Sequence, residues 1–103
     1  MLFRYTSSPV AEFTASDFSL IQKISTKRNA EFGVTGQLEF DGTRFFQEIE
    51  GGVAPIALLV GVILSDPRHR DISVEAFQRI EMRSHAAFVT GGLSEQRKPG
   101  DTG

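Results

Sequence analysis

The sequence predicts an α+β domain in which two helices cover one face of a mixed β-sheet. Two apolar runs with the period of strands flank Asp41-Gly42, a dipeptide typical of a β-hairpin turn. A capping box at residues 14–17 predicts a helix before this hairpin, and Pro55 predicts the first turn of another helix after it. Strand patterns at both ends complete the order of a ferredoxin-like βαββαβ sandwich, with an additional fifth strand.

Length and composition indicate one ordinary domain. We expect the 103-residue chain to fold over residues 1–93 and to end in a polar, disordered tail over residues 94–103. The net charge of −2 offers no basic field for nucleic acid, and the most apolar run, residues 53–64, is too short to span a bilayer. Because the chain has no cysteine and opens without a signal peptide, we expect a cytoplasmic protein without disulfides or thiolate metal sites.

The first strand, predicted over residues 1–7, places Phe3, Tyr5 and Ser7 on one face of the sheet. Tyr5 is the only tyrosine in the chain. It is either an ordinary strand aromatic or a phenol aimed into a pocket beside Ser7.

The first helix, predicted over residues 15–31, has a broad arc that faces the core. Ser25, Arg28 and Asn29 join this arc near the C-terminal end of the helix. Asn29 is either a helix cap, with Arg28 a solvated charge that suits the helix dipole, or both belong to a polar strip facing the interior. The whole arc comprises Phe18, Ile21, Ser25, Arg28, Asn29 and Phe32.

The hairpin contains one residue that the strand pattern does not explain. In its second strand, Phe45, Gln47 and Ile49 share a face, so Gln47 should point into the core with its apolar neighbours. A buried amide without hydrogen-bond partners costs about 1–3 kcal/mol, so Gln47 should have partners there. A two-residue turn would place Gly36 opposite Gln47 and leave open space beside the amide, whereas a bulged loop would shift this register. The two strands are predicted over residues 34–40 and 44–50.

The second half of the chain adds a helix, a loop and two strands. The helix, over residues 55–65, carries no charge, so it is either buried in the domain or meets a partner subunit. The polar loop over residues 66–71 is either a solvated turn or a ligand-binding segment. Strands are predicted over residues 74–80 and 86–91; the first would place Val74, Ala76, Gln78 and Ile80 on one face.

No catalytic arrangement stands out in the sequence. His69 and His85 have no acid at catalytic or metal-ligand spacing, and neither phosphate-loop nor dinucleotide fingerprints occur. We therefore expect no enzyme and no metal site. The inward groups Tyr5, Asn29 and Gln47 predict a polar-lined cavity between helices and sheet, suited to a flat, hydrogen-bonding ligand.

Five segments, in this order and spacing, resemble the BLUF (blue light using flavin) photoreceptor domains over about residues 1–90. They are Tyr5-Thr6-Ser7, Ser25-Thr26-Lys27-Arg28-Asn29-Ala30, Val34-Thr35-Gly36, Phe45-Phe46-Gln47-Glu48-Ile49-Glu50-Gly51 and Asp66-Pro67-Arg68-His69.

This resemblance implies noncovalent FAD, with its ring inserted between the two helices. It implies that Asn29 bonds the flavin edge, that Gln47 bridges the flavin and Tyr5, and that light drives electron transfer from Tyr5 with proton movement through Gln47. Gln47 would end rotated or tautomerised, and the family does not decide between the two. The other residues implied to bind the cofactor are Ser25, Arg28, Leu38, Phe45, Ile63, Asp66, Arg68 and His69.

The sequence departs from the family in its last strand, where a Trp and a Met are usual. Phe88 and Thr90 stand at those positions, and His85 stands where an aromatic is more usual. Alternatives therefore remain: a flavin-binding domain with lost or altered signalling, or a cofactor-free interaction module. The resemblance implies signalling through protein contacts, with a second subunit in a homo-oligomer or with a separate output protein.

Overall fold

The computed structural model describes residues 1–10 and 12–92 of the chain. The predicted tail over residues 94–103 lies outside the described residues. The elements are β1 (Leu2–Pro9), α1 (Ala15–Glu31), β2 (Thr35–Phe40), β3 (Phe45–Glu50), α2 (Val53–Ser65), β4 (His69–Gln78) and β5 (Phe88–Gly92).

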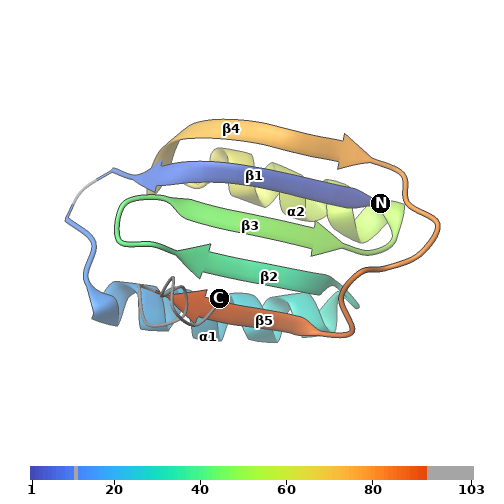
Figure 1. The fold of residues 1–103 in the computed structure, drawn as a ribbon, viewed down its shortest axis with the longest axis horizontal. Helices are drawn as coiled ribbons and strands as arrows, with labels where there is room; N and C mark the ends of the chain where they lie inside the picture. The colour runs from blue at the N-terminus through green and yellow to red at the C-terminus, as the bar shows by residue number, and fades with distance from the viewer. Residues whose placement is uncertain (11, 93–103) are drawn as a thin grey trace, which may run out of the picture.

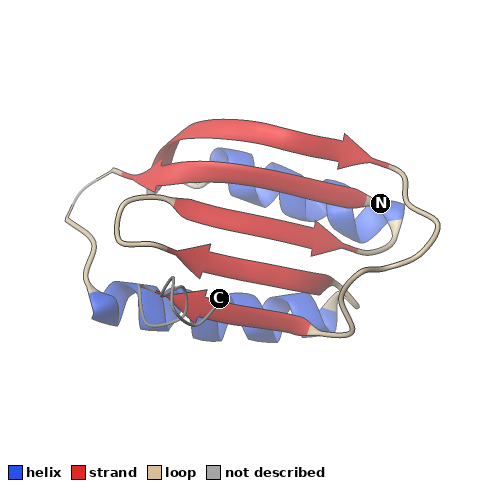
Figure 2. Ribbon diagram, viewed as in Figure 1, coloured by secondary structure: helices blue, strands red, loops and turns tan. Residues whose placement is uncertain are grey.

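One five-stranded sheet organises the domain, in the order β4-β1-β3-β2-β5 (Figure 1). The β1–β3, β1–β4 and β2–β3 pairs are antiparallel, and β5 runs parallel to β2 at the edge. Both helices lie on the same face of the sheet, behind it in the view of Figure 2. The predicted ferredoxin-like sandwich with a fifth strand is confirmed.

Helix α1 begins at the predicted capping box. The hydroxyl of Thr14 accepts a hydrogen bond from the backbone N–H of Asp17, and the Asp17 carboxylate accepts from the Thr14 N–H in return. The Thr14 N–H lowers the pKa of the Asp17 carboxyl. In α2, Pro55 lies in the first turn as predicted, two residues after the start at Val53.

The core has two parts, one under each helix. The cluster under α2 packs around Ile49, which is completely buried, and the cluster under α1 is made mostly of phenylalanine rings. Phe88 of β5 packs against both clusters. The first cluster comprises Phe3, Tyr5, Val34, Ile49, Ile56, Leu59 and Ile63; the second comprises Phe18, Leu38, Phe40 and Phe45.

The hairpin register differs from the prediction. Leu38, not Gly36, lies opposite Gln47, and Gly36 lies opposite Ile49. The loop is longer than two residues because one carboxylate oxygen of Asp41 accepts hydrogen bonds from the N–H groups of both Thr43 and Arg44, each at 2.8 Å. These bonds organise residues 41–44 into a turn that the Asp41-Gly42 dipeptide alone did not indicate.

Gly36 therefore has another role than leaving space beside the amide. Its φ is +146°, and a Cβ at this position would lie 1.9 Å from the Glu48 carbonyl oxygen. The close backbone approach between β2 and β3 requires glycine there.

Strand β4 also differs from its predicted course. It begins at His69, so half of the predicted loop is strand, and its pairing with β1 contains two register shifts. Consequently Val74 lies opposite Tyr5, and Phe77 lies opposite Phe3, on the face that carries the helices. The expected shared face for Val74, Ala76, Gln78 and Ile80 is wrong, since an irregular strand does not keep a period of two.

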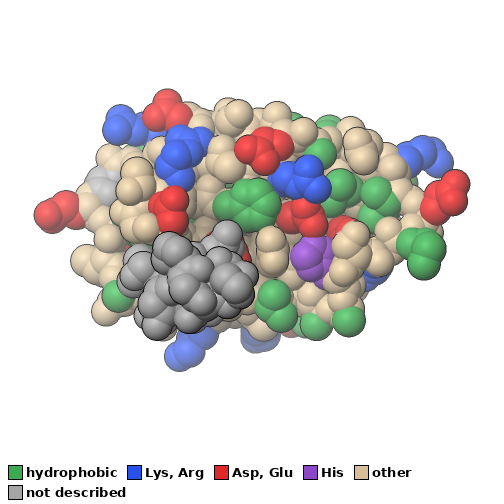
Figure 3. All heavy atoms as spheres, in the orientation of Figure 1, with side chains coloured by type: hydrophobic (Ala, Val, Ile, Leu, Met, Phe, Trp, Pro, Cys, Tyr) green, Lys and Arg blue, Asp and Glu red, His purple; other side chains and the backbone are tan. Residues whose placement is uncertain are grey.

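The other sheet face carries no helix in the described part of the chain and displays charged as well as apolar side chains (Figure 3). Glu48 points to this face, opposite in direction to Gln47. Its carboxylate accepts from Arg4 at 2.7 Å and contacts His85 at 2.5 Å. Burial acts to raise the pKa of Glu48, but the bonds to His85 and Arg4 together lower it.

None of the helices in the described part of the chain combines the length and the apolar character that a bilayer crossing requires.

Candidate functional site

A pocket opens between the two helices and ends on the centre of the sheet; we call it the central pocket. Its cavity volume of about 70 Å³ corresponds to roughly two water molecules at the density of the liquid. Strands β1, β2 and β3 form its floor, α1 and α2 form its walls, and the segment from Asp66 to His69 forms one rim. The lining residues are Tyr5, Ile21, Ile24, Ser25, Arg28, Leu38, Phe45, Gln47, Val62, Ile63, Asp66, Arg68 and His69.

Tyr5 and Gln47 form a bonded pair on the pocket floor. They lie opposite each other on β1 and β3, and the Tyr5 hydroxyl donates to Gln47 Oε1 at 2.6 Å. Burial raises the pKa of Tyr5, and the Asp66 charge adds to this, while Arg28 opposes it. The phenol is therefore neutral at neutral pH and able to donate its proton to the amide.

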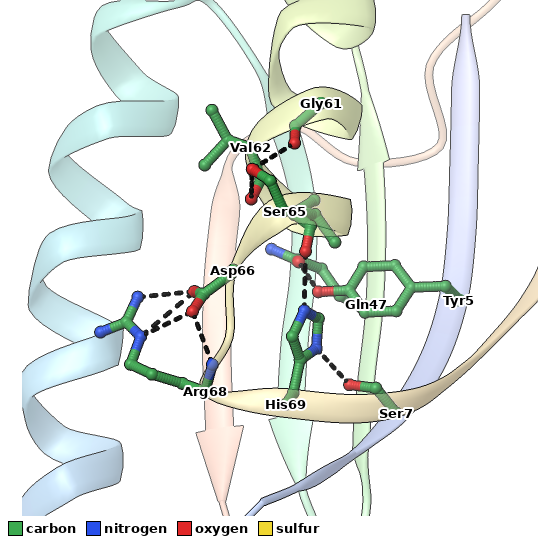
Figure 4. A network of polar contacts seen from close by, with 10 residues as sticks. Tyr5, Ser7, Gln47, Gly61, Val62, Ser65, Asp66, Arg68 and His69 are labelled. Carbon is green, nitrogen blue, oxygen red and sulfur yellow. Dashed lines mark hydrogen bonds and ion pairs between the residues drawn. The ribbon is translucent and has the colours of Figure 1, made fainter.

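The Gln47 amide has a second end that faces the pocket. Its carbonyl oxygen accepts from Tyr5, so its NH₂ group points away from the phenol, toward α1 (Figure 4). The side chain is nearly completely buried. Its two donors therefore face a space where a ligand acceptor can meet them.

His69 fixes the rim of the pocket beside Tyr5. Its Nε2 lies 2.7 Å from the carbonyl oxygen of Ile63, and its Nδ1 lies 2.7 Å from the Ser7 hydroxyl (Figure 4). Because a carbonyl can only accept, Nε2 carries the proton, and in the neutral ring Ser7 donates to Nδ1. The imidazole meets the Tyr5 ring edge-on, with ring centroids 6.1 Å apart.

Three charged groups stand around the pocket mouth. Asp66 and Arg68 form a bidentate ion pair, which lowers the pKa of the carboxyl and raises that of the guanidinium (Figure 4). Arg28 is half-buried, and burial lowers its pKa. Its Nε is buried without a hydrogen-bond partner in the described structure.

Asn29 is the strongest sign that a polar ligand belongs at this site. Its side chain is completely buried, yet neither its Nδ2 nor its Oδ1 has a hydrogen-bond partner among the described residues. The helix cap is Phe32, and Asn29 contributes only its backbone carbonyl to the turn that follows, so the capping interpretation of its side chain is wrong. A buried amide in this state costs about 1–3 kcal/mol.

The residues present fit a flat heteroaromatic group with donors and acceptors along its edge. Apolar side chains supply two walls, and the amides of Gln47 and Asn29 can each both donate and accept. The isoalloxazine ring of a flavin is a group of this kind. Asn29 lies one turn beyond Ser25 on the same face of α1.

Ten of the eleven residues that the sequence suggested for the site line the central pocket. Asn29, the eleventh, is buried beside them on α1. Sequence reasoning missed the apolar lining residues Ile21, Ile24 and Val62. Ile21 belongs to the predicted core arc, and Ile24 and Val62 are about half exposed, so hydrophobic periodicity gives no reason to place them at a site.

The two unusual positions of β5 have identifiable contacts. Phe88 packs against both core clusters. Thr90 Oγ1 accepts a hydrogen bond from Gln22 Nε2 of α1 at 3.0 Å. His85 contacts Glu48 on the helix-free sheet face, away from the central pocket.

Comparison with known sequences gives one family. Residues 1–91 match the profile of BLUF, described as sensors of blue-light using FAD. The chain is 31% identical over 86 residues to photoactivated adenylate cyclase subunit beta of Euglena longa. It is 41% identical over 49 residues to the blue light- and temperature-regulated antirepressor BluF of Escherichia coli. The matches cover 84% and 48% of this chain but 10% and 12% of the relatives, so the chain spans about a tenth of their length.

Solved structures agree with the sequence comparison. The dark-state structure of BlrB, a BLUF protein, superimposes with a TM-score of 0.84 at 28% identity, covering 93% of this chain and 74% of that chain. A bacterial light-regulated adenylyl cyclase gives a TM-score of 0.83 at 27% identity, covering 98% of this chain and 30% of that chain. The described fold is thus that of known blue-light sensor domains.

Proposed function

The chain belongs to the BLUF family of blue-light flavin sensors, and from this we propose that it is a photoreceptor that binds FAD noncovalently in the central pocket. As a domain of this family it is a photosensor and not an enzyme. The observation that carries the proposal is the buried amide of Asn29, whose Nδ2 and Oδ1 have no partner among the described residues, beside a pocket with apolar walls that Gln47 also lines.

Different residues of the chain would contact different parts of a bound flavin. Asn29, Ser25 and Arg28 would hold its polar edge from α1, and Gln47 would hold it from the sheet. The apolar walls include Leu38, Phe45 and Ile63, and Asp66, Arg68 and His69 would close the outer edge of the pocket. Bound flavin would supply the absorption of blue light and the redox chemistry of its excited state.

The response to light is proposed to lie in the Tyr5–Gln47 pair. Tyr5 is an oxidisable phenol whose proton can pass to Gln47 Oε1 along their 2.6 Å hydrogen bond. A half-turn or tautomerisation of the Gln47 amide would then reverse the direction of that bond. It would also change which hydrogen-bond donors and acceptors of the amide face the pocket. The signal would be this changed hydrogen-bond pattern, with the cofactor chemically the same before and after.

The experiment is an absorption spectrum of the purified protein before and after blue illumination. We expect a yellow protein that releases FAD on denaturation, and a small, reversible red shift of the flavin band in light. Release of FMN instead would correct the cofactor assignment. A protein that stays colourless after incubation with flavins would contradict the proposal and support the cofactor-free interaction module.

The output is proposed to pass through protein contacts of a cytoplasmic protein. Helix α2 carries no charge and exposes apolar side chains, which suits contact with a second copy in a homo-oligomer or with a separate output protein. Relatives are named as a cyclase subunit and as an antirepressor. The exposed apolar residues of α2 are Val53, Leu58, Val62 and Leu64.

A second candidate is a flavin-binding domain without signalling, favoured by Phe88 and Thr90 in the last strand. Such a protein would be yellow but show no difference between light and dark. Phe88→Trp combined with Thr90→Met would then restore a response, and absence of recovery would contradict this explanation.

A further inference from the structure

The central pocket contains more positive than negative charge. Among its described lining residues, Arg28 and Arg68 carry guanidinium groups, whereas Asp66 carries the one carboxylate. The phenol of Tyr5 is neutral because burial raises its pKa. The His69 ring is either neutral or, if protonated, a further positive charge. At least one positive charge is therefore left over among the described residues of the pocket.

The charge that is left over belongs to Arg28. The Asp66 carboxylate accepts hydrogen bonds from Nε and Nη2 of Arg68, at 3.0 and 2.7 Å, so these two charges on the rim largely cancel. Arg28 forms no ion pair with any residue in the ranges 1–10 and 12–92, and its buried Nε has no hydrogen-bond partner there. A half-buried cation without a counter-ion is unfavourable, and an anionic ligand would stabilise it.

The charge of Arg28 acts on the floor of the pocket. Burial raises the pKa of Tyr5, and Arg28 is the strongest influence in the opposite direction. Arg28 lies one turn beyond Ser25 and Ile24 on α1, and all three line the pocket. A cation at this position stabilises negative charge on a group bound between α1 and the sheet, although solvent screens part of the effect.

A flavin ring can be neutral or negatively charged, depending on its redox state. The oxidised ring is neutral, and two electrons from an external donor together with one proton convert it into a reduced ring with one negative charge. Charged groups beside the ring shift the balance between the two forms. We propose that Arg28 makes the central pocket bind the reduced, anionic form of a flavin more tightly than the oxidised form. The inference rests on the proposed function and adds to it a property that does not need light.

The first test is the reduction potential of the bound flavin, measured by stepwise reduction with dithionite in the presence of a reference dye. In Arg28→Gln, the affinity for reduced flavin relative to oxidised flavin should fall about tenfold, because one partly screened unit charge is lost. The potential should therefore fall by about 30 mV, which is the value of a tenfold change for a two-electron couple. Arg28→Lys keeps the charge and should stay close to the wild type.

Two further variants separate the charge of Arg28 from general effects on the fold. Asp66→Asn removes the carboxylate of the rim, so the potential should rise instead of fall. Lys27→Gln makes the same change of charge at the neighbouring, exposed position of α1 and should leave the potential unchanged. An unaltered potential in Arg28→Gln, or an equal fall in Lys27→Gln, would overturn the inference. If Arg28→Gln does not fold, a potential that fails to rise in Asp66→Asn would overturn it.

The second test does not need flavin. Tyr5 is the only tyrosine and the chain has no tryptophan, so the absorption of phenolate reports on this residue alone. Biosynthetic replacement of tyrosine by 3,5-difluorotyrosine gives a more acidic phenol, which ionises at a lower pH than tyrosine. In the flavin-free protein, the ionisation midpoint of this phenol should be higher in Arg28→Gln than in Lys27→Gln, because only the first variant loses the cation of the pocket. Equal midpoints would contradict the action of Arg28 on the pocket.

The outcomes distinguish this inference from the proposed function. A wild type that binds neither oxidised nor reduced flavin would contradict the proposed function, and the preference for the reduced form with it. The ionisation of the fluorinated Tyr5 would then still decide whether Arg28 sets the charge of the pocket. A wild type that binds flavin and shifts its band in light, but keeps the same potential when Arg28 is replaced by Gln, would overturn the inference alone.

Discussion

Asn29 shows how a single side chain can indicate a ligand. An asparagine that is fully buried without hydrogen bonds from its side chain reduces the stability of the protein on its own. Such a residue lowers the free energy of unfolding unless another molecule forms hydrogen bonds with its side chain. Gln47 differs, because Tyr5 already satisfies one end of its amide. Under the proposed function the two amides would therefore make different contributions: Asn29 would depend on the ligand for its hydrogen bonds, and Gln47 would connect the ligand to Tyr5.

The first prediction concerns Asn29→Leu, which keeps the volume of the side chain and removes its polar atoms. The flavin-free protein should gain about 1–3 kcal/mol in free energy of unfolding, because an unsatisfied buried amide has been removed. Flavin affinity should fall about tenfold, since a buried hydrogen bond to the ligand is lost. Urea denaturation and fluorescence titration with FAD measure the two effects.

The exposed Ser16→Ala on the same helix provides the control and should change neither quantity appreciably. A flavin-free Asn29→Leu protein that is less stable than the wild type would mean that the asparagine has partners in the free protein.

At the scale of elements, the strands depart from a regular alternation of inward and outward side chains at two places, the hairpin turn and β4. Side-chain hydrogen bonds and irregular backbone account for these departures. The Asp41 carboxylate sets the hairpin turn, and Asp71, with a φ of +54°, lies in the irregular part of β4. The sequence could predict which residues form strands and helices, because apolar period and caps carry that information. It could not predict the hairpin register or the bulges of β4, because these depend on contacts between segments that periodicity does not record.

The central pocket was predictable in part, because the apolar period of the strands shows which side chains face the interior. The strand period alone pointed Tyr5 and Gln47 toward one interior space. The resemblance to a known family supplied most of the other residues. Ile24 and Val62 escaped prediction because they are exposed helix positions that become pocket walls only when α1 and α2 face each other.

Gly36→Ala gives the second prediction. A Cβ at this position meets the Glu48 carbonyl oxygen at 1.9 Å, and backbone cannot move aside as a flexible side chain does. We expect a loss on the order of 3 kcal/mol in free energy of unfolding, or failure to fold. Gly61→Ala is the matched control: nothing lies within 4 Å of its added Cβ, and alanine favours the helix, so it should stabilise α2 by roughly 0.5–1 kcal/mol. Thermal unfolding measures the stability of both variants. An equal change in stability in the two variants would contradict the close approach of β2 and β3.

At the scale of the whole molecule, a few carboxylates connect segments that are distant in the chain. Glu48 joins β3 to β1 through Arg4 and to the segment before β5 through His85. The Glu50 carboxylate is almost fully buried and accepts hydrogen bonds from the N–H groups of Ser84 and His85. These contacts hold the connection to β5 over the helix-free face, while the hydrogen bond from Gln22 to Thr90 holds β5 on the other face. The edge strand β5 is thus held from both sides.

The third prediction is acid sensitivity. Bonds in the folded protein lower the pKa values of Asp41, Glu48 and Asp66 below the ordinary 3.8 for aspartate and 4.5 for glutamate. The unfolded chain therefore binds protons first as pH falls, so stability is full above these ordinary values and decreases as pH falls through the lowered ones. The urea midpoint should be constant from pH 7 to about pH 5 and decline below about pH 4. Asp41→Asn should make that decline shallower; an unchanged decline would exclude Asp41 as a contributor.

The most direct measurement of the central claim, that Gln47 joins Tyr5 to a bound flavin, is the light-minus-dark absorption spectrum of Gln47→Leu and Tyr5→Phe beside the wild type. Gln37→Leu, a partly buried glutamine on the neighbouring strand, serves as the matched control. We predict that all four proteins are yellow, that the wild type and Gln37→Leu show the reversible red shift, and that Gln47→Leu and Tyr5→Phe show none. A full red shift in either of the last two would contradict the account.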